Sequence, residues 1–169
     1  MPPSKSRSAR GPDAVALLKK DHETVRKLLK RLDEAKGASE RKALFERVRE
    51  EVQVHSQIEE EIFYPAFRSA AEDDKKELKI FFEAKEEHHI ADVVIDELSG
   101  GDPAGSPYAA KCKVLKDLVE HHAEEEEEEM FPHAKRLMGK EALADLGRRL
   151  AERKKELQAA SSKLRPTGS

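Results

Sequence analysis

The sequence has no tryptophan, a single cysteine and few aromatic residues, which make up 5% of its 169 residues. Strands are usually rich in aromatic residues, whereas 40% of this chain is charged, so the composition is more typical of long solvated helices with narrow apolar stripes. The lone Cys112 cannot form an internal disulfide, which favours a reducing compartment. We therefore expect a helical, cytoplasmic protein.

Long apolar runs and a strong excess of one charge are also missing. The chain has no run of about 18 apolar residues, and its polar start, MPPSKSRSARGP, has no apolar h-region, so we expect neither a membrane span nor export. The net charge is −3 and no domain is strongly basic, so composition gives no reason to expect nucleic acid as a partner. No Ser-His-Asp set, nucleotide-binding glycine loop or CxxC motif is present.

Apolar residues do recur at steps of three and four over most of the chain, which predicts amphipathic helices. Four long helices with short connections are typical of an up-down-up-down bundle. We predict an all-α fold, with a four-helix bundle over residues 13–138 and an additional C-terminal amphipathic helix over residues 139–160. The polar ends, residues 1–12 and 161–169, are expected to be flexible tails.

Helix boundaries are expected at residues with capping or breaking roles. Asp13, Ser39 and Ser106 are candidate N-caps of the first, second and fourth helices, because their side chains can accept hydrogen bonds from free backbone N–H groups. Pro65 is expected to kink or end the second helix near Tyr64. The inner face expected for that helix carries Phe45, Val48, Val52, His55, Glu59, Ile62 and Ala66.

Two halves of the sequence resemble each other. One alignment pairs DHETVRKLLKRL with EHHIADVVIDEL, and a second pairs HSQIEEEIFYPAF with HAEEEEEEMFPHA. The neighbouring His89 and His121 lie about 100° round their helices, on the polar side, and are expected to be solvated or to support the ligands. The aligned pairs are His22 with His88, His55 with His122, and Glu59 with Glu126.

These four histidines and two glutamates interrupt four apolar stripes. A buried polar layer of that size would destabilise the bundle by about several kcal/mol unless something compensated it, and a metal ion can do so. Counting residues from the helix ends places the histidines within about one turn of the same level, with each glutamate four residues after its histidine and on the same face. Imidazole with carboxylate favours Fe, Mn or Zn, and carboxylates shared inside a bundle are typical of di-iron and di-manganese sites.

At these residues the sequence resembles the hemerythrin-like family of HHE cation-binding domains, over roughly residues 13–138. The family pattern is a His, an H-x-x-x-E, an EH and a second H-x-x-x-E on successive helices. The matching residues are His22, His55 with Glu59, Glu87 with His88, and His122 with Glu126. The resemblance implies two iron ions, with Mn or Zn as alternatives. It places His22 and His55 on one ion, His88 and His122 on the other, and Glu59 and Glu126 as bridges between the two.

The sequence differs from oxygen-carrying members of the family at one ligand. They have a fifth histidine one turn along the third helix, where this chain has Asp92 after His88 and Ala84 before it. This difference favours reaction with, or sensing of, oxygen, peroxide or iron over reversible oxygen carriage. The expected partner is a small ligand such as oxygen or peroxide. The alternatives are a metal-free helical interaction module and a peroxide-disproportionating, catalase-like di-iron enzyme.

Overall fold

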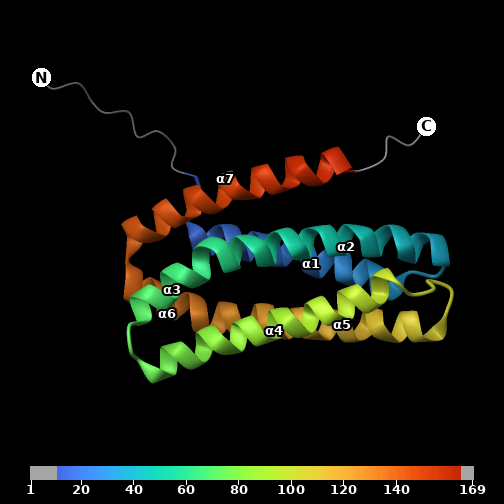
Figure 1. Cartoon of the computed structure of the whole chain (residues 1–169), viewed down its shortest axis with the longest axis horizontal. Helices are drawn as coiled ribbons and strands as arrows, with labels where there is room; N and C mark the ends of the chain where they lie inside the picture. Colours follow the sequence, from blue (N-terminus) through green and yellow to red (C-terminus); the bar gives the residue numbers. More distant parts are fainter. Residues whose placement is uncertain (1–10, 165–169) are drawn as a thin grey trace, which may run out of the picture.

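The computed structural model describes residues 11–164, and every regular element within them is helical (Figure 1). Much of the predicted tails, residues 1–10 and 165–169, lies outside this range. Residues 161–164, expected to belong to the C-terminal tail, continue the last helix. The elements are α1 (Ala14–Glu34), α2 (Ala38–Ile58), η1 (Glu59–Phe63), α3 (Tyr64–Ala71), α4 (Lys75–Ser99), α5 (Ser106–Glu125), η2 (Glu126–Met130), α6 (Phe131–Met138) and α7 (Lys140–Leu164).

Four long rods form the bundle (Figure 1). They are α1, the continuous helix α2–η1–α3, α4, and the continuous helix α5–η2–α6, and the chain direction alternates from each to the next. The first rod packs against α2 and α5, and α4 packs against α5 and α3. Helix α7 lies outside the bundle along α1 and α2. The predicted all-α, up-down-up-down bundle with an additional C-terminal helix is therefore confirmed. None of the helices in residues 11–164 is both long and apolar enough to cross a membrane.

The predicted helix caps are correct for α1 and wrong for α2 and α5. Asp13 accepts a hydrogen bond of 2.8 Å from the backbone N–H three residues later. The residue before α2 is Gly37, so Ser39 lies inside the first turn. Similarly, Gly105 precedes α5 and Ser106 is already helical. Both glycines have extended backbones and supply no side-chain cap, so the first turns of α2 and α5 lack the capping hydrogen bonds predicted from the serines.

The second rod, expected to kink or end near Tyr64, contains a π-helical turn just before Pro65, and the fourth rod contains an equivalent turn. The Tyr64 N–H donates to the Glu59 carbonyl, five residues back, and the Phe131 N–H donates in the same way to Glu126. Each turn ends directly before a proline, Pro65 in one rod and its counterpart in the other. The prediction that the helix ends near Tyr64 was wrong, because the wider turn accommodates a residue without an N–H and the helix continues.

Each π turn also rotates the helix face that follows it. The predicted inner face of the second rod is correct as far as Glu59. Beyond that point Phe63, Tyr64, Phe67 and Ala71 are buried, whereas Ile62 and Ala66 are only partly buried. An inserted residue shifts the inward positions by one, which periodicity alone could not reveal.

The apolar core has two clusters separated by a polar layer. On α1, Leu18 belongs to one cluster and Val25 to the other, with His22 between them. On α4, Ala84 and Ala91 belong to different clusters, with His88 between them. The packing therefore holds the candidate site at mid-height and seals it above and below with apolar side chains.

Candidate metal centre

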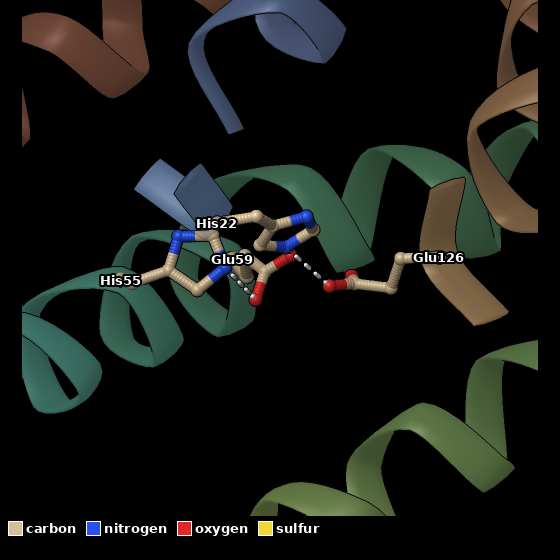
Figure 2. Close-up of side chains that lie close together, drawn as sticks. All are labelled: His22, His55, Glu59 and Glu126. Carbon is tan, nitrogen blue, oxygen red and sulfur yellow. Dashed lines mark hydrogen bonds and ion pairs between the residues drawn. The ribbon is translucent and has the colours of Figure 1, made fainter. Parts of the chain in front are cut away.

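All six predicted ligand residues meet in this polar layer and are buried. The imidazole rings of His22 and His55 have centroids 4.9 Å apart, and those of His88 and His122 are 4.6 Å apart. Figure 2 shows His22, His55, Glu59 and Glu126 reaching toward one another from three rods. The prediction that all four histidines share one level of the bundle is correct.

Glu126 contacts one histidine from each pair. Its Oε1 lies 3.2 Å from Nε2 of His22 and 3.1 Å from Nε2 of His122. The carboxylate therefore spans the two halves of the layer, which is the position that a bridging ligand needs.

Glu59 spans the layer in the same way. Its Oε1 lies 3.0 Å from Nε2 of His55 and 3.3 Å from Nε2 of His88, yet neither Glu59 oxygen has a hydrogen-bond partner among the described residues. His55 Nε2 is unsatisfied as well. Ligand atoms that are buried and close together, without hydrogen bonds of regular geometry, are costly unless protons or a cation lie between them, so these residues fit a metal ion.

The ligand atoms fall into two overlapping groups. In each group the atoms lie within 4.8 Å of one another, and both groups include Glu59. The first group is His22, His55, Glu59 and Glu126, and the second is Glu59, His88 and His122. This arrangement matches the predicted division of the histidines into two pairs with shared carboxylates.

Carboxylates that the sequence analysis missed orient the other ring nitrogen of the histidines. Asp21 Oδ2 lies 3.0 Å from Nδ1 of His55, and Glu87 Oε1 lies 3.0 Å from Nδ1 of His122. A carboxylate accepts a hydrogen bond from Nδ1–H and so leaves Nε2 free as the ligand atom. Asp21 is itself held by Lys154, which connects α7 to the centre.

The other two histidines face carboxylates at longer range. Glu60 Oε1 lies 3.6 Å from Nδ1 of His88, and Glu127 Oε2 lies 3.7 Å from Nδ1 of His22. Arg26 pairs with Glu127 from the outer side. A signal for these groups was present in the repeat, because each such carboxylate directly precedes a candidate histidine or directly follows a candidate glutamate.

Tyr64 and Phe131 occupy equivalent positions in the internal repeat but differ at the site. The Tyr64 hydroxyl donates to Glu126 Oε2 at 3.1 Å and lies 3.1 Å from Nε2 of His88. Phe131 instead stacks on His22, with ring centroids 5.7 Å apart. Burial raises the pKa of Tyr64 well above its usual value, with the negative charge of Glu126 adding to the effect, so the phenol keeps its proton.

A cavity of about 30 Å³ adjoins the centre. All four candidate histidines line it, and much of the remaining wall is apolar, including Val25, Val52, Ala91 and Leu118. Since a single water needs about 10–15 Å³, the cavity has room for a molecule of only a few atoms.

The remaining histidines lie away from the centre. His89 is exposed and His121 is 62% exposed, as predicted from their positions round the helices. His133 Nδ1 lies 2.7 Å from the buried Glu77 carboxylate, and His133 belongs to neither group of candidate ligands. Arg136 holds the other Glu77 oxygen, so this carboxylate is compensated without a metal.

Comparison with known proteins agrees with the fold and gives the family. The hemerythrin HHE cation-binding domain matches residues 13–134, and the chain belongs to this family. The uncharacterized proteins Rv2633c of Mycobacterium tuberculosis and Mb2666c of Mycobacterium bovis are each 28% identical over 153 residues, which cover 88% of this chain and 89% of theirs. The crystal structure of a hemerythrin HHE cation-binding domain-containing protein from Mycobacterium kansasii, a Rv2633c homolog, is 29% identical, with a TM-score of 0.79, covering 94% of this chain and 96% of that one.

Metal binding should release protons from the centre. Burial lowers the pKa of His55, but the charge of Glu59 and the contact with Asp21 raise it more, to about 10. The pKa of His88 and His122 is also raised by their carboxylate neighbours despite burial. At pH 7 the metal-free protein therefore holds protons that must leave before Nε2 can bind a cation, and we expect about two to three protons released per chain on loading with Zn²⁺.

Isothermal titration in buffers of different ionisation enthalpy would count these protons. The number should fall as the pH approaches 10, because His55 is then losing its proton before the metal arrives. A heat of binding that does not depend on the buffer at pH 7 would contradict the prediction.

The carboxylate behind His55 should affect metal affinity. Asp21→Asn keeps the side-chain shape but removes the charge that holds the Nδ1 proton, and it places an amide beside Lys154. We expect Zn²⁺ affinity at one of the two positions to fall about 10–100-fold in competition with a chromophoric chelator. Asp33→Asn, an exposed change on the same helix, is the control and should leave the affinity unaltered. Equal affinities for the two variants would show that Asp21 does not tune the ligand.

Proposed function

We propose that the chain holds two iron ions between its bundle helices and uses them to react with, or to sense, oxygen or peroxide. The observation that carries the proposal is that Glu59 and Glu126 each contact one histidine from both pairs. Family membership supports cation binding, and the imidazole–carboxylate donor set suits iron better than magnesium or calcium. When bound, iron would supply redox chemistry and an electrophilic centre for a small oxygen ligand.

The size of the site supports a small ligand. The cavity of about 30 Å³ is lined by all four histidines and by several aliphatic side chains, so its volume suits oxygen or hydrogen peroxide and is too small for larger organic substrates. The protein's part is to position the ligand beside the centre and to limit the entry of water.

The missing fifth histidine supports reaction over reversible carriage. At the two positions one turn from His88, Ala84 has no donor atom, and the exposed Asp92 belongs to neither metal group. Coordination positions are therefore left to water or to the incoming ligand. A centre that both halves leave open favours electron transfer over simple release of the ligand.

Metal content tests the first part of the proposal. After anaerobic loading with Fe²⁺ and removal of unbound ion, we expect two iron atoms per chain, and Glu59→Ala or Glu126→Ala should lose most of this metal because each carboxylate serves both ions. His89→Ala is the matched control, since His89 is exposed on the same helix as His88. A folded wild-type protein that retains no metal would overturn the proposal and favour a metal-free interaction module.

Peroxide disproportionation is the second candidate function, and Tyr64 is the observation that favours it. One peroxide is oxidised to oxygen while another is reduced to two waters, so two protons must move from the first molecule to the second. The Tyr64 hydroxyl, which donates to Glu126 Oε2 at 3.1 Å, is placed to relay protons between the two peroxide molecules: its oxygen accepts one proton as it passes on another, so no phenolate has to form. Phe131 offers no such group in the other half.

Tyr64→Phe should therefore slow oxygen release from peroxide by about 100-fold, with the iron content retained. An oxygen electrode would follow the steady state. Tyr108→Phe is the control, because Tyr108 is also buried but packs against Phe45 in the apolar cluster away from the centre. Equal rates for the two variants would remove Tyr64 from the reaction, and a wild-type protein without sustained oxygen release would exclude the enzyme.

A further inference from the structure

A third group of potential ligand atoms lies on the surface beside the centre. It consists of Glu87 from α4 with His121 and Glu125 from α5. His121 Nε2 lies 3.1 Å from Glu125 Oε1 and 3.6 Å from Glu87 Oε2, and the three ligand atoms lie within 4.8 Å of one another. Because His121 is 62% exposed, a cation in solvent could reach this group directly.

Glu87 belongs to both the outer group and the inner centre. Its Oε2 faces His121, whereas its Oε1 accepts from Nδ1 of His122 at 3.0 Å. One carboxylate thus separates an exposed imidazole from a buried candidate ligand. The Glu87 side chain alone therefore connects the outer group to the centre.

A small cavity lies between the outer group and the centre, because Glu87 and Glu125 of the outer group line it together with Glu126. This cavity of about 20 Å³ is lined by five carboxylates together with Ile80, Ala84 and Met130, and none of its lining residues is basic. Four of the carboxylates are exposed or partly exposed, whereas Glu126 is only 2% exposed and belongs to the inner centre. The five are Glu83, Glu87, Glu125, Glu126 and Glu129. A narrow passage lined by one sign of charge attracts cations.

The internal repeat shows that the outer group is not a general consequence of the bundle. The position equivalent to His121 is Val54, and the position equivalent to Glu125 is Ile58. The equivalent of Glu87 is Asp21, which Lys154 already neutralises. The first half therefore offers no imidazole and a paired carboxylate where the second half offers a complete set of donors.

We propose that Glu87, His121 and Glu125 form an outer site that captures a divalent transition-metal ion from solvent and passes it along the carboxylate-lined cavity to Glu126. One imidazole with two carboxylates suits Fe²⁺, Mn²⁺, Co²⁺ or Zn²⁺. Exposure makes the site weak and exchangeable, as delivery requires. Capture stands on the outer residues alone, whereas delivery rests on the proposed two-metal function.

Mn²⁺ binding tests capture. Full-length protein is first saturated with Zn²⁺, freed of excess ion and titrated with Mn²⁺, with free Mn²⁺ followed by electron paramagnetic resonance. We expect one additional ion per chain, lost in His121→Ala and in Glu125→Gln but retained in His89→Ala. Additional binding that is equal in all four proteins, or absent from the wild type, would overturn the outer site. The same titration of metal-free protein reads the outer site even if the inner centre holds nothing.

Uptake kinetics test delivery. Stopped-flow mixing of metal-free protein with Co²⁺ would follow the absorption of ions that reach the inner centre. We expect uptake by His121→Ala to be about tenfold slower than by the wild type or His89→Ala, with the same final Co²⁺ content, and the difference should shrink at high salt. Equal uptake rates would overturn delivery. Inner loading that fails in every protein would instead count against the two-metal function, because the Mn²⁺ titration reports capture separately.

Discussion

The rest of the structure depends on two carboxylates whose charge is buried in the middle of the helical bundle. Glu59 is fully buried and Glu126 is nearly so, and a carboxylate taken out of water is strongly destabilising unless positive charge meets it. The four histidines meet that need from all sides, in part as protonated rings when no metal is present. Each histidine also needs a group that orients its ring. Four further carboxylates therefore surround the histidines, those of Asp21, Glu60, Glu87 and Glu127. The two apolar clusters exclude water from this arrangement.

The internal repeat produces two half-sites that are similar but not equivalent. Tyr64 brings a hydroxyl to the half that contains His88 and His122, whereas the equivalent Phe131 presents only a phenyl face to His22. The outer carboxylates differ as well, since Asp21 is bound by Lys154 of α7 and Glu87 faces an exposed histidine. Ions held in the two halves would therefore experience different charge and different proton supply. The two halves therefore differ in the charge around the histidines and in their exposure to solvent.

The sequence predicted the bundle and the six candidate ligands because both leave periodic signals. The repeat shows that His22 is not an isolated core histidine, because it aligns with His88. It also distinguishes His88 from its neighbour His89, because only His88 stays in register with the apolar stripe. Capping was less predictable, because Gly37 and Gly105 work through backbone conformation, which composition does not encode. The orienting carboxylates were hidden for another reason. In a chain with 40% charged residues, Glu60 looks like any solvated surface glutamate until the neighbouring helix is in place.

The π turns connect these observations, because they begin at the two bridging candidates. In a regular α-helix a residue five positions after Glu59 would point about 140° away from it. The hydrogen bond from the Tyr64 N–H to the Glu59 carbonyl instead places Tyr64 one wide turn above Glu59, on the same face. Only then can its hydroxyl reach Glu126 and His88. Pro65 has no N–H to lose from the interrupted ladder, so it fits the position directly after the turn. A residue that usually breaks a helix thus accompanies the distortion that brings the tyrosine hydroxyl to the metal site.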